Sequence, residues 1–226
     1  MRIGGFQKLS LVDFPGMVAA TIFTQGCNFR CSYCHNPQLV LPQSFQVPLA
    51  PEKVLDYLKE RRGKIEGIVI SGGEPTIQAG LIDFIVNIKI MGFALKLDTN
   101  GSHPEVLSAL FDLKLLDYVA MDIKTTFEKY DKLVGSACDI SKFKESIHLI
   151  VNSNIPYQFR TTLVKEFCLD KDLDGIQLMI KGADHYVLQP FVFTQQMVNH
   201  QLVFQEQYTN TQTELLKEKY ELKGKV

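Results

Sequence analysis

The stretch VAATIFTQGCNFRCSYCHNP, residues 18–37, places a short apolar run directly before a loop with three cysteines. The run Val18–Thr24 is rich in apolar and β-branched residues, which predicts a buried strand. Cys27, Cys31 and Cys34 follow with the spacing C-x3-C-x2-C. In parallel α/β folds the loops at the carboxyl ends of the strands form the binding site. We therefore expect this loop to carry the function.

The rest of the chain alternates β-rich runs with helical patterns. Five further short apolar runs predict strands at Gly67–Ser71, Ala94–Asp98, Tyr118–Asp122, Tyr157–Val164 and His185–Gln189. Helical patterns occupy Pro51–Arg62, Ala79–Met91, Pro104–Leu113, Ser141–Asn152, Leu169–Lys181 and Thr211–Lys223. The polar, Gln-rich stretch Gln195–Asn210 predicts a loop. Repeated β-α units indicate a parallel sheet, either open or curled into a barrel.

Composition restricts the class of protein. The chain has 226 residues, of which 46% are hydrophobic and 22% charged, as expected for one compact domain. We expect that domain to span residues 1–226, with its core at about 18–190 and a C-terminal cover and helix at 191–226. The net charge of −1 offers no basic surface for nucleic acid. No export signal or membrane-spanning run is visible, so we expect a cytoplasmic protein.

The cysteine triplet allows three interpretations. A disulfide framework is disfavoured by the odd count and by the expected reducing compartment. A zinc site needs four ligands, and His35, directly after Cys34, would be a cramped fourth. Cys138 and Cys168 are single and distant, and we expect them to be core or surface thiols. An iron–sulfur cluster held by three thiolates would leave one iron open to a substrate.

Polar and glycine-rich motifs follow the other predicted strands. They are Ser71–Pro75, Asp98–Gly101, Asp122–Lys124 and Gln189–Pro190, and a parallel sheet would bring them to the same edge as the cysteines. Each motif also has a purely structural interpretation. Gly72 and Gly73 suit a tight turn, Asp98 suits a cap, and Asp122 with Lys124 suits an ion pair. Arg160 lies inside an apolar strand and is either outward-facing or a buried cation that needs an anion.

These motifs resemble those of a known superfamily. The C-x3-C-x2-C spacing with Tyr33 before the last cysteine, followed by a GGE turn, is similar to the radical S-adenosylmethionine superfamily. The run SLVDFPGMVAATIFTQGCNFRCSYCHNP resembles the activating enzymes of glycyl-radical enzymes, such as pyruvate formate-lyase activase and the activator of anaerobic ribonucleoside-triphosphate reductase. The later stretches LDTNG, MDIK and KYDKLVG also resemble that group.

The resemblance implies a fold, a cofactor and a cosubstrate. The fold is α/β, a partial six-stranded parallel (βα)6 barrel, TIM-barrel-like. A [4Fe-4S] cluster bound by Cys27, Cys31 and Cys34 would cleave S-adenosylmethionine reductively to a 5′-deoxyadenosyl radical. That radical would generate a glycyl radical on a partner enzyme, with flavodoxin or ferredoxin as electron donor. No side-chain acid or base is expected, because the cofactor carries the chemistry.

The resemblance also implies roles for the cosubstrate residues. Tyr33 would pack beside the adenine, and the turn formed by Gly72, Gly73 and Glu74 would hold the methionine amino group. Arg160 would face the methionine carboxylate.

Three polar residues are matched to a cation site. Asp98, Thr99 and Asp122 match positions that ring a monovalent cation in pyruvate formate-lyase activase. Asp122 to Lys124 resemble a stretch near the substrate peptide.

One departure selects among the possible partners. Pro190-Phe191-Val192 stands where formate-lyase activase has Pro-Tyr-His, and this chain lacks the cysteine-rich insert of some activases. The departure favours an activator of anaerobic ribonucleoside-triphosphate reductase, or an unassigned branch of these enzymes, over formate-lyase activase itself. Two alternatives remain at this point: a radical enzyme acting on a small molecule, similar to deazapurine synthases, and a non-enzymatic iron–sulfur or metal-binding redox module.

Overall fold

The computed structural model describes residues 1–194, 196–198 and 207–223. Seven strands form one sheet in the order of the sequence, β1-β2-β3-β4-β5-β6-β7. The strands are β1 Ile3–Ser10, β2 Ala19–Thr24, β3 Gly67–Gly72, β4 Ala94–Thr99, β5 Tyr118–Asp122, β6 Tyr157–Leu163 and β7 Tyr186–Pro190. Strands β2 to β7 are parallel, and no pairing between described residues joins β1 to β7. The predicted partial six-stranded parallel barrel is confirmed.

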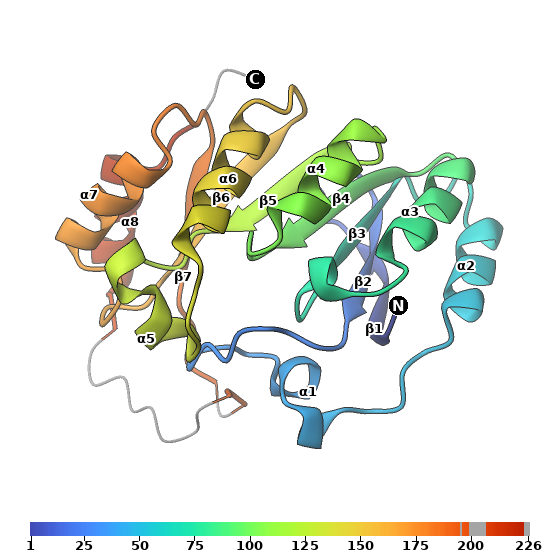
Figure 1. Cartoon of the computed structure of the whole chain (residues 1–226), viewed down its shortest axis with the longest axis horizontal. Coiled ribbons are helices and arrows are strands. Elements are labelled where there is room, and N and C mark those ends of the chain that lie inside the picture. The colour runs from blue at the N-terminus through green and yellow to red at the C-terminus, as the bar shows by residue number, and fades with distance from the viewer. Residues whose placement is uncertain (195, 199–206, 224–226) are drawn as a thin grey trace.

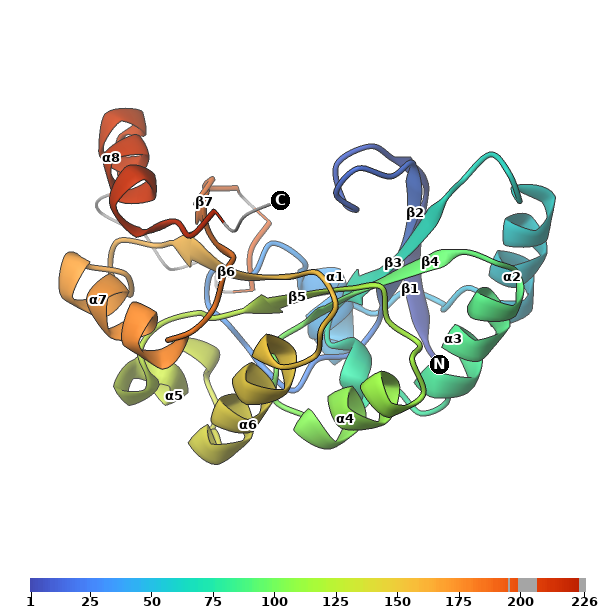
Figure 2. The same ribbon diagram turned by 90° about the horizontal axis from the view of Figure 1, so that it is seen from above.

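Helices alternate with the parallel strands. They are α1 Pro37–Val40, α2 Pro51–Glu60, α3 Leu81–Ile90, α4 Pro104–Asp112, α5 Tyr130–Val134, α6 Ile140–Val151, α7 Asp170–Met179 and α8 Asn210–Tyr220, with short 3-10 turns at Pro42–Ser44, Pro75–Ile77 and Phe127–Lys129. The sheet is curved, and the helices from α2 to α7 lie along its convex side, whereas α8 lies beside β7 (Figures 1 and 2). Within the described residues, no helix combines the length and apolar character that crossing a membrane requires.

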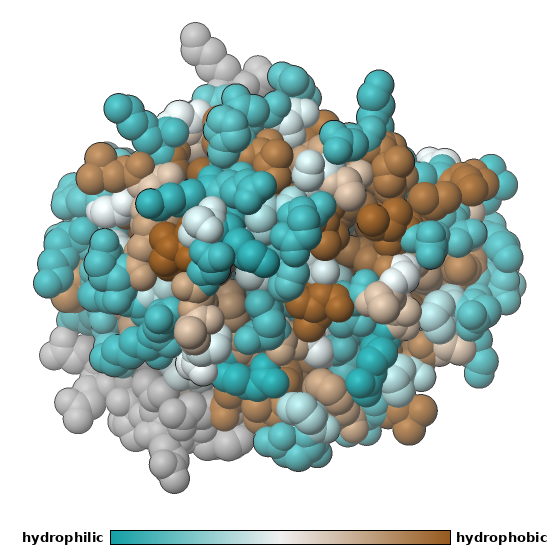
Figure 3. Space-filling model, viewed as in Figure 1, coloured by the Kyte–Doolittle hydropathy of each residue, from teal (hydrophilic) through white to brown (hydrophobic). Residues whose placement is uncertain are grey.

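Alternate residues of each strand face opposite sides of the sheet, which produces two different interiors. Ile22, Ile70 and Leu97 belong to the main core beneath the helices. The concave side holds a smaller apolar cluster in which Phe14 packs against Val69. Above it, towards the carboxyl ends of the strands, the concave side is polar. The helical face in Figure 3 mixes polar and apolar residues.

The predicted strands and helices coincide with the observed ones within about two residues, except at the C-terminal end of α8. Strand β1 was missed, because Gly4, Gly5 and Gln7 give it a weak β pattern. It pairs antiparallel with β2 through an irregular register, so tertiary pairing creates this strand. The short helices α1 and α5 were also missed. The predicted loop at Gln195–Asn210 lies largely outside the described residues.

Candidate active site

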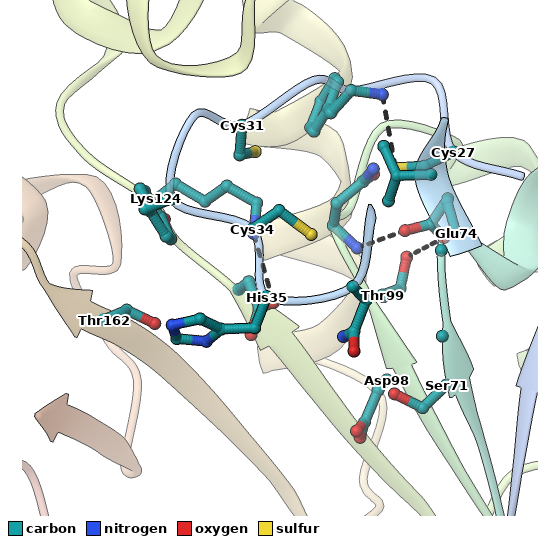
Figure 4. Close-up of a pocket in the computed structure, with 18 of the residues that line it drawn as sticks. Cys27, Cys31, Cys34, His35, Ser71, Glu74, Asp98, Thr99, Lys124 and Thr162 are labelled. Atoms are coloured by element: carbon teal, nitrogen blue, oxygen red, sulfur yellow. Dashed lines mark hydrogen bonds and ion pairs between the residues drawn. The ribbon is translucent and has the colours of Figure 1, made fainter. Parts of the chain in front are cut away.

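A cavity of about 220 Å³ lies at the carboxyl ends of the parallel strands, beneath the cysteine loop. Every residue that the resemblance assigned to the cluster or the cosubstrate lines it, whereas Gln189 and Pro190 do not, and Figure 4 shows the arrangement. The predicted lining residues are Cys27, Cys31, Tyr33, Cys34, Gly72, Gly73, Glu74, Asp98, Thr99, Asp122, Lys124 and Arg160. Cys138 and Cys168 do not line it. The loop therefore closes over strand ends from β3 to β6.

The three cysteines of the loop are free thiols around one common space (Figure 4). Burial raises the pKa of the Cys27 thiol to about 12 and that of Cys31 to about 11, and it also raises the pKa of Cys34. Thiolates are therefore disfavoured here unless a cationic metal centre compensates for the lost hydration. Among the described residues, no three Cys, His, Asp or Glu side chains converge closely enough for a single metal ion. A zinc site would need a fourth ligand, whereas a four-iron cluster would take three thiolates and leave one iron open.

The cysteine loop is in direct backbone contact with the turn after β3. Glu74 N donates to Gly26 O at 2.8 Å, and Gly73 N donates to Thr24 O at 2.9 Å. A Cβ atom on Gly73 would lie 2.0 Å from Gly26 O, and one on Gly72 would lie 2.3 Å from Thr24 N. Within the chain, the nearest neighbours of these two glycines are the end of β2 and the cysteine loop itself.

The other side of the cysteine loop rests on α5 and the turn before it. Arg30 N donates to Val134 O at 2.7 Å, and the Arg30 guanidinium donates to Cys27 O at 2.7 Å. Tyr130, fully buried, packs on Phe143 with ring centroids 4.6 Å apart, and its hydroxyl oxygen accepts a hydrogen bond from Lys124 N at 3.1 Å. The KYDKLVG stretch therefore supports the cysteine loop on the side that faces α5.

Glu74 is buried and accepts four hydrogen bonds. The donors are Thr76 N, Thr76 Oγ1, Thr99 Oγ1 and Asn100 N, at 2.6–3.1 Å. Burial raises the pKa of Glu74 even though these bonds oppose the shift. The side chain thus joins the β3 turn to the end of β4, a role that the sequence did not reveal.

Asn28, between two of the cysteines, extends this connection. It accepts from Asn100 Nδ2 at 2.9 Å and donates to Ser102 Oγ at 2.9 Å. A chain of hydrogen bonds therefore links the cysteine loop to β4 through side chains that the sequence analysis had not assigned to the site.

The floor of the cavity is a charged network on the concave face of the sheet. Asp98 accepts from Lys96 through Oδ1 and from Arg160 through Oδ2, the latter at 3.4 Å. Asp122 accepts from Arg160 through Oδ1 at 2.9 Å and from Lys124 through Oδ2 at 3.4 Å. Arg160 is thus an inward-facing cation whose side chain is 14% exposed, close to one of its two interpretations, and its anions are carboxylates of neighbouring strands.

The electrostatics of the floor favour its charged forms. Burial alone would raise the pKa of Asp122, but the charges of Arg160 and Lys124 outweigh it and hold that pKa below its ordinary value. Burial opposes the charge of Arg160, yet Asp122 and Asp98 raise its pKa above the ordinary value. The pKa of Lys124 is likewise raised by Asp122 against the effect of burial.

An aromatic wall borders the cysteines on the β7 side. Phe191 meets Tyr33 edge-on at 6.1 Å and stacks on the His35 ring at 5.4 Å. His35 Nε2 lies 2.7 Å from Val192 O, and Val198 N donates to Cys34 O at 3.0 Å. The segment after β7 therefore covers the outer side of the cysteine loop.

Comparison with known proteins identifies the family. The model of the Radical SAM superfamily matches residues 21–171. The chain belongs to the radical SAM superfamily. Its members use a [4Fe-4S] cluster and S-adenosylmethionine, so this enzyme uses the same cofactor and cosubstrate. In this radical SAM enzyme the matched segment begins in β2 and ends in α7, and it includes every residue of the predicted site.

Curated relatives refine the comparison. The chain is 36% identical over 197 residues to a protein of Methanocaldococcus jannaschii that carries the name glycyl-radical enzyme activating enzyme, covering 84% of this chain and 79% of that one. It is 35% identical over 133 residues to the pyruvate formate-lyase-activating enzyme of Clostridium pasteurianum, covering 54% and 52% respectively.

Solved structures share the fold at low sequence identity. Streptococcus suis SuiB bound to S-adenosylmethionine gives a TM-score of 0.67 at 12% identity, covering 88% of this chain and 47% of that one. TYW1 with a lysine-pyruvate adduct bound gives 0.65 at 15% identity, covering 89% and 72%. At these identities the likeness shows the fold alone.

Proposed function

We propose that this radical SAM enzyme activates a glycyl-radical enzyme, most specifically anaerobic ribonucleoside-triphosphate reductase. One observation carries the proposal: all the residues expected for the cluster and for S-adenosylmethionine line the same cavity. The relatives support the general activity, since the M. jannaschii protein is named for activating glycyl-radical enzymes. The specific partner rests on Phe191 and Val192, which replace the Tyr-His of formate-lyase activase.

The residues present fit the cluster. Cys27, Cys31 and Cys34 would hold it, because their thiols surround one space and thiolates are the ligands that iron–sulfur clusters require. When bound and reduced, the cluster supplies the electron that cleaves S-adenosylmethionine to methionine and a 5′-deoxyadenosyl radical. The chain's own part is to exclude water from the buried side and to orient the cosubstrate.

The residues also fit the cosubstrate. The floor contributes Lys124 and Arg160 for its carboxylate, and Tyr33 provides an aromatic surface for its adenine. The turn at Gly72 and Gly73 would offer backbone carbonyls to its amino group, with Glu74 holding that turn in place. No residue acts as acid or base in this scheme.

The glycine of a partner loop suits this site for a steric reason. Without a side chain, its α-carbon can come close to the adenosyl carbon. We also propose that flavodoxin or ferredoxin donates the electron, because Cys27 and Cys34, two of the thiols that would hold the cluster, are only half-buried and are accessible from the surface. We place the enzyme in the cytoplasm, where its five free cysteines stay reduced.

The test is anaerobic activation of a purified partner. Reconstituted enzyme, reductant and S-adenosylmethionine are mixed with anaerobic ribonucleoside-triphosphate reductase, and the glycyl radical is measured by EPR. We expect the radical together with methionine and 5′-deoxyadenosine, and neither with the Cys31→Ala variant. A radical on a different glycyl-radical enzyme would change the partner only. Cleavage without any protein radical, accompanied by turnover of a small molecule, would contradict the activase proposal.

A further inference from the structure

The residues expected to surround a monovalent cation all have partners within the chain. The two oxygens of Asp98 accept from Lys96 and Arg160, and those of Asp122 accept from Arg160 and Lys124. The third expected ligand, Thr99, donates its hydroxyl to Glu74 at 2.7 Å and accepts from Gly101 N at 3.1 Å. This arrangement does not fit the cation that the resemblance implies.

Lys96 is the residue that makes the difference. It stands two positions before Asp98 on β4, so both side chains lie on the concave face. Its side chain is only 2% exposed, and its ammonium lies 6.0 Å from the centre of the Tyr118 ring. A buried ammonium group needs a carboxylate partner, and the described residues provide Asp98 for it. The Lys96 ammonium thus places a fixed positive charge beside the Asp98 oxygen that an inorganic cation would bind.

We infer that Lys96 replaces the monovalent cation, so that this enzyme binds S-adenosylmethionine without Na⁺ or K⁺. The inference rests on the proposed cosubstrate site. Lys96, Lys124 and Arg160 face two carboxylates, which leaves one positive charge in excess on the floor. That excess matches the carboxylate of S-adenosylmethionine. Lys96 acts as a positioning residue, because it holds Asp98 and leaves the Arg160 guanidinium turned towards the cavity.

Calorimetry of S-adenosylmethionine binding to the reconstituted enzyme tests the inference. Titrations at constant ionic strength compare NaCl or KCl with N-methylglucamine chloride. We expect the affinity of the wild-type enzyme to change less than about twofold between these salts. In Lys96→Met the affinity should fall about tenfold or more in N-methylglucamine and recover in Na⁺ or K⁺, because the ion enters the freed position beside Asp98.

Two controls separate this effect from a general one. Lys89, on α3, forms an ion pair with Asp117. Lys89→Met removes the same charge there and should show no dependence on the cation. Lys96→Arg keeps the charge and should stay independent of the cation even if it is less stable.

The possible failures differ from one another. A wild-type enzyme that needs Na⁺ or K⁺ for affinity would overturn the inference alone. A Lys96→Met variant that folds, as shown by its thermal transition, but is not rescued by cations would overturn it too. Absence of binding in every salt would overturn both the proposed cosubstrate site and this inference.

Discussion

Gly73 and Gly26 are in backbone contact: a Cβ atom on Gly73 would lie 2.0 Å from the carbonyl oxygen of Gly26. This contact joins the turn after β3 to the loop that carries the cysteines. The neighbouring hydrogen bond, from Glu74 N to Gly26 O at 2.8 Å, fixes the same junction. The position of the cysteines therefore depends on a residue with no side chain in the turn after β3.

The Gly73→Ala variant should lose its iron. Because the new Cβ would meet backbone atoms of Gly26, which cannot rotate away as a side chain can, the cysteine loop must shift, and the three thiols would move with it. We expect reconstituted protein to bind less than about half of the roughly four irons of a [4Fe-4S] cluster. Gly5→Ala is the matched control, since its new Cβ would meet only the Phe23 ring at 3.4 Å. Full iron content in Gly73→Ala would show that the contact between residue 73 and Gly26 can relax without displacing the cysteines.

Replacing the cysteines one at a time should separate ligands from bystanders. Cys27→Ala, Cys31→Ala and Cys34→Ala should each abolish the cluster, measured as iron and sulfide per chain and by visible absorbance. Cys138→Ala should retain it, because Cys138 lies outside the cavity. Stoichiometric zinc in protein purified anaerobically from iron-replete cells would contradict the cluster assignment.

Glu74→Gln should destabilise the protein and weaken cosubstrate binding. All four partners of Glu74 act as donors, and two of them are backbone N–H groups that cannot reverse their role. An amide nitrogen facing them leaves at least one buried donor unsatisfied, which costs about 1–3 kcal/mol of unfolding free energy. Urea denaturation measures this loss. Glu145→Gln, at an exposed position on α6, is the control. Equal midpoints for the two variants would exclude the proposed connecting role.

Arg160→Gln should weaken S-adenosylmethionine binding while the cluster remains. The change removes the shared partner of Asp98 and Asp122 and the excess positive charge of the floor. Loss of a charge-assisted hydrogen bond corresponds to about 1.5–3 kcal/mol, or roughly tenfold to a hundredfold in affinity. Binding by calorimetry and iron content are measured on the same sample. An unchanged affinity with full iron content would show that Arg160 pairs with carboxylates of the sheet but does not contribute to cosubstrate binding.

Low pH should weaken the ion pairs of Asp122 in the floor of the cavity and so lower the unfolding free energy. The folded pKa of Asp122 lies below its ordinary value, so its pairing stabilises the protein above the unfolded pKa of about 3.9. That stabilisation is lost as the pH falls through the folded pKa. We expect the wild-type unfolding free energy to drop more steeply below about pH 4 than that of Asp122→Asn, which lacks this group. Urea unfolding of both proteins between about pH 3 and 6 measures the difference, and parallel profiles would contradict it.

Sequence alone determined the local features of this protein. The cysteine spacing, the strand runs and the polar residues after each strand are contiguous along the chain, so periodicity and short motifs reveal them. The parallel arrangement then follows from the alternation of strands and helices, and it brings the strand ends to one edge. This is why every predicted site residue lines the cavity.

Tertiary structure decided which groups pair with one another. Asp98 meets Arg160 from β6 across 62 positions of the sequence, and Glu74 meets Asn100, directly after β4. Strand β1 forms through its pairing with β2, with one further bridge from Ile3 to Leu49. In the sequence Lys96 is an ordinary charged residue within an apolar run. Only the folded, curved sheet shows that its side chain is buried on the concave side. Partners of a buried charge depend on the register and twist of neighbouring strands, and these are properties of the packed sheet rather than of any one segment.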